Sequence, residues 1–388
     1  MKKMALVYVM AAGLAVGAVV PMVGAETGAA AEVVKGVESV KPKVQIAILL
    51  DTSGSMDGLI EQAKTQLWKV VNEFAKGKVD GKRPEIEVAL YHYGNDGLAS
   101  STGYVKQLTP LTTDLDKVSE ELFKLKTNGG SEYCGTVIQA ATKELEWSKE
   151  KNAYKAIFIA GNEPFTQGSV DYKESCKAAI TKGIIVNTIH CGSEKEGIEG
   201  KWKDGAVLAD GSFMVINQDQ KIVPVVSPQD KEIAELSGKI NETYVGYGKK
   251  GEEGVARQAA QDQNAAKASP SSAAERGSTK GGNSYTNSEW DLVDAVKDGK
   301  AKLSEVKEDD LPAELKKLSV KEREEYVAKK LKEREDIQAK LKELSVARDK
   351  YIAEKRKDAS GDKTLDTAII EAVRTQAKRV DMKFEEGK

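Results

Sequence analysis

Histidine is scarce in this chain, with 2 residues among 388, and there are only 3 cysteines. So few imidazoles argue against a histidine-based metal centre and against a hydrolase that uses a charge relay. The formal net charge is only -2, so no overall field attracts nucleic acid or a membrane surface. Beyond the first 25 residues, no apolar run approaches the roughly 20 residues that a spanning helix needs. These absences leave a globular protein whose function depends on a local site.

The first 25 residues have the pattern of an export signal. Lys2 and Lys3 are followed by an apolar run over Ala5–Val20, and Val23-Gly24-Ala25 provides small residues for cleavage before Glu26. We therefore expect an exported protein, periplasmic or secreted, with no stable membrane span after cleavage. The alternative is an uncleaved anchor, which the glycines within the run disfavour.

In an oxidising compartment, three cysteines predict one disulfide and one free thiol. Cys176 belongs to an expected helix, and Cys191 ends the strand that follows that helix. Both are expected near the same edge of a sheet, so the predicted bridge joins Cys176 to Cys191, with Cys134 left free.

Strands and helices alternate over residues 43–250. The runs V-Q-I-A-I-L-L at Val44–Leu50 and A-I-F-I-A at Ala156–Ala160 are continuously apolar, as in strands that are buried on both faces. Helical spacing lies between such runs. The last elements of the pattern are a helix over Gln229–Lys239 and a strand over Thr243–Tyr247. The sequence therefore predicts a doubly wound α/β domain with a mostly parallel sheet.

The remaining segments differ in composition from this domain. Residues 26–42 are small and polar and predict a disordered lead-in. Residues 251–284 contain few large apolar side chains and predict a flexible linker. Residues 285–388 predict a separable, charged helical tail that packs as a hairpin on itself or on the α/β domain. A coiled coil with a partner is the alternative, although Arg334 and Arg348 interrupt its apolar seam.

The segment over residues 194–226 predicts a small β insertion. Asp210-Gly211 between two apolar runs is a strong hairpin signal, and Ile222–Val226 can supply a third strand. One role for this insertion is to cover an exposed sheet edge. The other is to form a lip beside the binding site, where Trp202 and Phe213 contact a partner.

The loop that follows the first expected strand has the residues best suited to a binding site. Asp51, Ser53 and Ser55 provide a carboxylate and two hydroxyls at alternate positions, at the edge of the sheet where such folds bind ligands. Hard cations such as Mg²⁺ prefer oxygen ligands, and Mn²⁺ and Ca²⁺ are further candidates. The alternative is that these side chains only cap the next helix and satisfy turn amides.

Two loop motifs and the element order together carry a family resemblance. D-T-S-G-S at Asp51–Ser55 and G-G-S-E at Gly129–Glu132, with the elements around them, resemble the von Willebrand factor A domain family over roughly residues 43–250. E-I-A-E-L-S-G-K-I-N-E-T-Y-V looks like the family's last helix and strand. The resemblance implies a doubly wound sheet and a metal-ion-dependent adhesion site. In that site, Asp51, Ser53 and Ser55 would be the D-x-S-x-S ligands.

Other positions depart from the family pattern. Ser131 stands where the family usually has threonine, and Glu132 stands where it often has aspartate. A third-loop carboxylate is expected near Gly161, but this chain has none there, so Asn162 or Glu163 would have to reach the ion directly or through water. The site residues expected from the sequence are therefore Asp51, Ser53, Ser55, Ser131, Glu132 and Glu163.

The expected function is that of a binding protein and not of an enzyme. An under-neutralised divalent cation has an open position that an acidic group of a protein or peptide partner can take. The alternative is a structural or assembly protein that acts mainly through its helical tail, with the α/β domain as a metal-free scaffold. No serine or cysteine has the sequence context of a nucleophile elbow.

Overall fold

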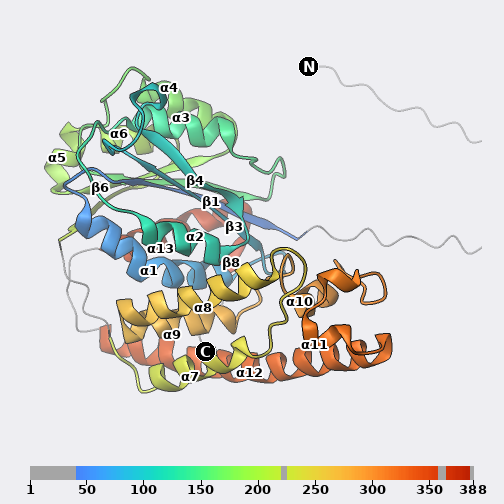
Figure 1. Ribbon diagram of the computed structural model, residues 1–388. Coiled ribbons are helices and arrows are strands. Elements are labelled where there is room, and N and C mark those ends of the chain that lie inside the picture. Colours follow the sequence, from blue (N-terminus) through green and yellow to red (C-terminus); the bar gives the residue numbers. More distant parts are fainter. Residues whose placement is uncertain (1–40, 220–224, 357–363, 385–388) are drawn as a thin grey trace, which may run out of the picture. The chain divides into compact units, whose positions relative to one another are not determined.

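The computed structural model describes residues 41–219, 225–356 and 364–384 (Figure 1). The predicted signal peptide, residues 1–25, and most of the lead-in, residues 26–42, lie outside these ranges. In the part of the chain that is described, no helix is both long and apolar enough to cross a membrane.

A six-stranded sheet forms the centre of the α/β region. Its order is β4-β3-β1-β5-β6-β7, with β1 parallel to both neighbours, and β4 pairs with β3 in the antiparallel sense. This arrangement confirms the predicted mostly parallel, doubly wound fold. The strands are β1 (Lys43–Asp51), β3 (Glu85–Tyr93), β4 (Val105–Thr112), β5 (Tyr154–Gly161), β6 (Ile185–Cys191) and β7 (Phe213–Ile216).

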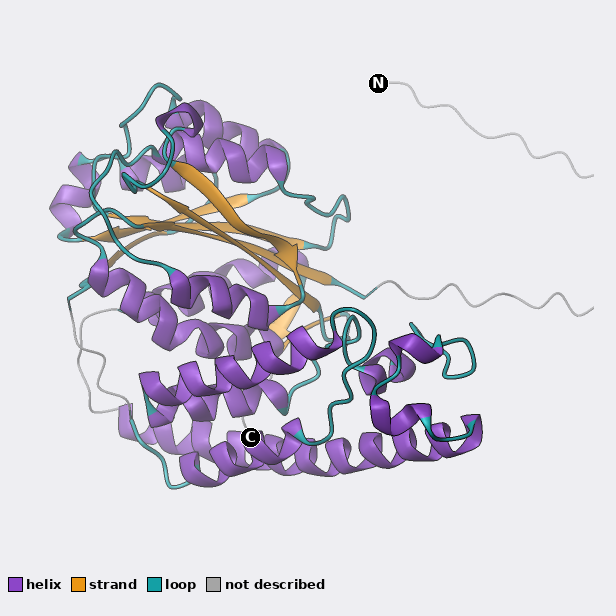
Figure 2. Cartoon of the chain, in the orientation of Figure 1, coloured by secondary structure: helices purple, strands orange, loops and turns teal. Residues whose placement is uncertain are grey.

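Helices cover both faces of the sheet (Figure 2). Along β1, Ile46 and Leu50 belong to one apolar core, whereas Ala47 and Leu49 belong to the core on the opposite face. Because side chains alternate between faces along a strand, a strand covered on both sides must be apolar throughout. One face packs against α1 (Asp57–Ala75), α2 (Leu115–Lys124) and α13 (Leu365–Gln376); the other packs against α3 (Cys134–Glu144), α4 (Tyr172–Thr181) and α6 (Trp202–Leu208).

Because α13 packs against the sheet, the prediction of a separable helical tail is wrong. Ala368, Ile369 and Val373 are buried in the same core as Ile46 and Leu50. After α13, a short strand β8 (Met382–Phe384) pairs with β2 (Gly77–Val79), just beyond α1. Residues 41–388 accordingly form one compact unit, because the C-terminal helix completes the face of the sheet.

The expected linker over residues 251–284 is also wrong. It folds into α8 (Gly251–Ala268) and α9 (Pro270–Lys280), which form a further layer against α1 and α2 (Figure 1). Glycines in these helices let large side chains approach closely. A Cβ at Gly254 would lie 2.3 Å from the Trp290 ring, and one at Gly277 would lie 2.7 Å from Ile233. The large apolar side chains that pack against α8 and α9 therefore belong to neighbouring segments. For this reason the composition of residues 251–284 alone did not predict that they fold.

The long helix predicted in the tail is confirmed as α12 (Val320–Arg356), but it does not form a hairpin with α13. It packs on α7 (Asp230–Asn241), on α9 and on α10 (Leu292–Lys297); a short helix, α11 (Ala313–Lys316), precedes it. Arg334 and Arg348 are 1% exposed and form buried ion pairs with carboxylates of those neighbours. The two arginines, which would interrupt a coiled-coil seam, thus make contacts within the chain.

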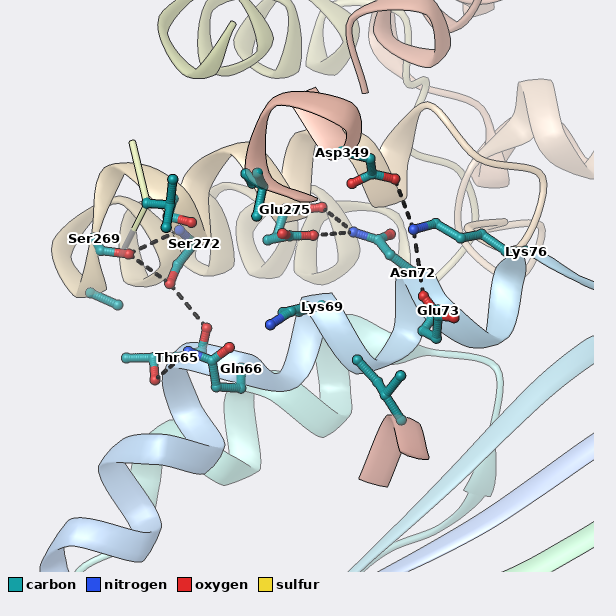
Figure 3. Close-up of a pocket in the computed structure, with 15 residues that line it drawn as sticks. Thr65, Gln66, Lys69, Asn72, Glu73, Lys76, Ser269, Ser272, Glu275 and Asp349 are labelled. Atoms are coloured by element: carbon teal, nitrogen blue, oxygen red, sulfur yellow. Dashed lines mark hydrogen bonds and ion pairs between the residues drawn. The ribbon is translucent and has the colours of Figure 1, made fainter. Parts of the chain in front are cut away.

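The interface between α1 and the helices α9 and α12 is polar (Figure 3). Asn72 on α1 donates to the Glu275 carboxylate at 2.9 Å, and Ser272 donates to the Thr65 carbonyl at 3.0 Å. Lys76 bridges to Asp349 on α12 at 2.8 Å. These groups line a cavity of about 140 Å³. Specific hydrogen bonds, in addition to apolar packing, therefore fix the helices to the α/β region.

The predicted last strand, Thr243–Tyr247, does not join the sheet. Gly246 forms a single bridge with Asp291, while Tyr244 and Val245 are buried among the helices. The guanidinium of Arg334 lies 3.9 Å from the centre of the Tyr244 ring. This apolar run is buried by the helical region and not by the sheet.

The predicted β insertion over residues 194–226 is wrong as well. The segment forms α5 (Glu194–Glu199), α6 and the parallel strand β7. A Cβ at Gly211 would lie 1.8 Å from the Val186 carbonyl oxygen, so the glycine allows close approach to β6 and does not form a hairpin turn. Most of the expected third strand, Ile222–Val226, lies outside the described residues. Trp202 is 1% exposed and cannot serve as a lip that contacts a partner.

All three cysteines are free and buried. Cys176 lies in the core on one face of the sheet and Cys191 in the core on the other face, so the predicted bridge between them is wrong. Cys191 ends β6 with its side chain directed away from α4, the helix that carries Cys176.

Candidate cation site

The loop after β1 forms a tight turn around the carboxylate of Asp51. The Ser53 amide donates to Asp51 Oδ1 at 2.8 Å, and the hydroxyl oxygens of Ser53 and Ser55 lie 3.4 Å apart. No side chain caps the start of α1 at Met56. Oδ1 therefore satisfies a turn amide, as the alternative interpretation expected, but the helix-capping part of that interpretation is wrong.

Glycines bring two further loops against this turn. Gly94, at a φ of 74°, follows β3, and a Cβ there would lie 2.8 Å from Asp51 Oδ1 and 2.9 Å from Glu132 Cγ. A Cβ at Gly130 would lie 2.3 Å from the Gly94 carbonyl oxygen. Only glycine fits at such contacts. The side chains of Asp51 and Glu132 consequently converge on the same point.

Asp51 is fully buried, and its second oxygen, Oδ2, has no hydrogen-bond partner among the described residues. Burial raises the pKa of Asp51 to about 7, and the Glu132 and Glu163 carboxylates add to this rise against the hydrogen bonds from Ser53. Burial, with Glu163, also raises the pKa of Glu132. A buried carboxylate that lacks a partner and faces other carboxylates is unfavourable unless positive charge is supplied.

The loop after β5 contributes an amide to this site. Asn162 Nδ2 donates to Ser55 Oγ at 3.1 Å, and Asn162 Oδ1 is buried with no hydrogen-bond partner among the described residues. Glu163 is exposed, and its carboxylate accepts from Gln167 at 3.3 Å. From the sequence, Asn162 and Glu163 are both candidates for the third loop; the hydrogen bond to Ser55 distinguishes Asn162 from Glu163.

The family model of the von Willebrand factor type A domain matches residues 45–198. These residues form a von Willebrand factor type A domain. Solved structures with similarity to the A domain are only distantly related in sequence. BatB from Bacteroides thetaiotaomicron is 20% identical over 45% of this chain and 90% of that chain, with a TM-score of 0.34. The SpRpn10 VWA domain is 18% identical over 47% of this chain and 100% of that chain, with a TM-score of 0.35.

A third solved structure is proximal thread matrix protein 1 from the mussel byssus, which has a zinc-occupied MIDAS motif. It is 14% identical over 46% of this chain and 43% of that chain, with a TM-score of 0.36. Among curated proteins, no match to the chain was found.

The A domain brings together most of the residues expected at its cation site. Asp51, Ser53, Ser55 and Glu132 lie within one cluster, to which Asn162 is added by its hydrogen bond. Two expected residues are less involved. Ser131 is half-buried beside Glu132, and Glu163 lies at the exposed side of the site.

The donors of this cluster fit a hard divalent cation. They are carboxylate, hydroxyl and amide oxygens, the ligand types that Mg²⁺, Mn²⁺ and Ca²⁺ take. The described residues contain no group of three or more histidine, cysteine, aspartate or glutamate side chains placed to hold a metal. Most of the side chains at this site provide hydroxyl and amide oxygens instead. The orphaned Oδ2 of Asp51 is the atom that a cation would satisfy.

Proposed function

We propose that this chain is an exported binding protein whose A domain captures a protein or peptide partner through a divalent cation. The observation that carries the proposal is the buried Asp51 carboxylate, whose free Oδ2 lies where three loops meet. Asp51, Ser53 and Ser55 would hold the cation, and Glu132 would face it. When bound, the cation would offer an open coordination position to an acidic group of the partner.

The helical region supports placing the partner at the cation site. On α12, Val327 and Leu341 are buried against the same chain, and the exposed large apolar side chains of this helix, Val320 and Val346, are widely separated along it. An assembly protein that acts through this helix would need an apolar face left for its partner.

Nothing in the cluster around Asp51 provides an activated nucleophile, and burial raises the pKa of all three cysteine thiols. We therefore favour binding over catalysis.

Isothermal titration with Mg²⁺ and Mn²⁺ tests the cation site. We expect one site in the mature chain and loss of binding in Asp51→Ala, with Glu174→Ala as control because Glu174 is exposed on α4. Absence of binding at millimolar metal, or equal binding in Asp51→Ala, would refute the proposal. Capture of partners from the extracytoplasmic fraction should then depend on the metal and be lost in EDTA.

A further inference from the structure

The space beside Gly161, where the resemblance led us to expect a carboxylate, is filled by the protein itself. A Cβ on Gly161 would lie 2.6 Å from the Tyr93 hydroxyl and 2.9 Å from Asp51 Oδ2. Tyr93 is fully buried, and its hydroxyl donates to the Ala160 carbonyl at 3.1 Å. No side chain can be placed at position 161 unless Tyr93 or Asp51 moves. The third loop therefore cannot provide a carboxylate there.

Asn162 is placed to provide a neutral oxygen instead. Its Nδ2 is fixed by donation to Ser55 Oγ at 3.1 Å, which leaves Oδ1 as the free end of the amide. Oδ1 is buried and has no hydrogen-bond partner in the described part of the chain, as is true of Asp51 Oδ2. Asp51 and Asn162 both contact the same serine-lined turn, and each has a buried acceptor oxygen without a partner, which is costly unless a positive group satisfies both oxygens.

Glu163 is held differently, although it is the neighbouring residue. Its side chain is exposed and accepts from Gln167 Nε2, while Gln167 Oε1 accepts from the Glu132 amide at 3.2 Å. Its backbone carbonyl accepts from Trp202 Nε1 at 2.8 Å, which fixes the loop on α6. Glu163 therefore acts on the site through its charge at a distance.

We propose that Asn162 Oδ1 is the third-loop ligand of the cation, and that its neutrality keeps a third negative charge away from the coordination position that an anionic partner takes. This inference rests on the proposed function. Asp51 and Glu132 together bring two negative charges, which equals the charge of a divalent cation. Ser53, Ser55 and Asn162 add oxygens but no charge. A carboxylate at position 162 would hold the cation more tightly and repel an incoming anion.

The test compares Asn162→Ala, Asn162→Asp and Glu163→Gln in the full mature chain. Mn²⁺ affinity is measured by isothermal titration, and acetate is then titrated into the Mn²⁺-loaded protein by water-proton relaxation. We expect Asn162→Ala to weaken Mn²⁺ binding by about tenfold or more, as loss of a ligand or its orienting contact does. We expect Glu163→Gln to change it by less than about threefold, since a distant exposed charge is well screened.

Asn162→Asp should have opposite effects on the two affinities. It should bind Mn²⁺ more tightly than the wild type, and the Mn²⁺-loaded variant should bind acetate about tenfold more weakly. Because aspartate has nearly the shape of asparagine, this variant keeps the test valid if Asn162→Ala unfolds, which circular dichroism reports. Equal Mn²⁺ affinity in wild type, Asn162→Ala and Asn162→Asp overturns the inference and leaves the cation site intact. A larger loss in Glu163→Gln than in Asn162→Ala also overturns it. A wild type that binds no Mn²⁺ refutes the proposed function itself.

Discussion

Substitution of Ile369 on α13 tests whether the C-terminal helix belongs to the core of the A domain. Ile369 is 4% exposed and lines two small apolar cavities of about 10 and 30 Å³ between α1 and the sheet. Truncation of a buried isoleucine to alanine costs about 2–5 kcal/mol. Because the existing cavities show that packing around Ile369 is incomplete, we expect Ile369→Ala to cost about 3 kcal/mol, in the lower half of that range.

The adjacent residue provides a matched control. Ile370 is half-buried and lines the polar cavity beside α9, so Ile370→Ala should cost only about 1 kcal/mol. Urea unfolding followed by circular dichroism measures both variants. With a denaturant slope of about 3 kcal/mol/M, Ile369→Ala should lower the midpoint by about 1 M. If it loses no more than Ile370→Ala, or if the loss is confined to a separate transition of the helical region, α13 is not part of the sheet's core.

Three further outcomes are expected. All cysteines should resist alkylation in the native chain, and all three should react after denaturation without a reductant; a bridged pair in peptide mapping would contradict this, since the thiols are free and buried. Asp116→Ala should cost about 3 kcal/mol in urea unfolding, because it removes one of the two carboxylates that pair with the buried Arg276 and leaves Asp262 alone to balance its charge; a loss below about 1 kcal/mol would show that the pair is solvated. Burial, aided by the charge of Arg276, lowers the pKa of Lys280 to about 8. Since this folded-state pKa lies below the usual value of 10.5, the unfolded chain binds the proton first, so stability should fall as pH drops from about 10.5 to 8 and level off below that. Lys280→Met should reduce that slope; an identical slope in both proteins would exclude Lys280 as its source.

The elements that could be predicted from the sequence are those whose partners are encoded nearby. The apolar run of β1 and the D-T-S-G-S loop after it define a buried strand and its turn by themselves, and the cluster of Asp51, Ser53, Ser55 and Glu132 follows from the sheet topology. Asn162 was one of two open candidates, because only the hydrogen bond to Ser55 separates it from Glu163.

The wrong predictions concern segments whose packing partners are distant in sequence. In α8 and α9, small residues are contacts for Trp290 and Ile233, so a low content of large apolar side chains did not indicate a linker. Gly211 appeared to be a turn residue because its contact with the Val186 carbonyl cannot be read locally. Apolar residues of α13 indicated a helix, but not that the helix covers a sheet whose last strand already ends at Ile216.

Gln62 shows how the helical region is attached to the A domain. This buried residue of α1 donates to the carbonyls of Asn217 and Gln218 at 2.9 and 3.0 Å, and its Oε1 accepts from the Leu365 amide at 3.1 Å. The chain therefore leaves the sheet after β7 and returns to it at α13, and Gln62 contacts both points. The helices α7 to α12 are thus an insertion within the α/β fold. Gln218 also donates to the Ser55 carbonyl at 3.0 Å. The point of departure thus contacts the loop of the cation site. The family match ends at residue 198, whereas the last strand of the sheet, β7, and the helix α13 that covers one of its faces come later in the chain.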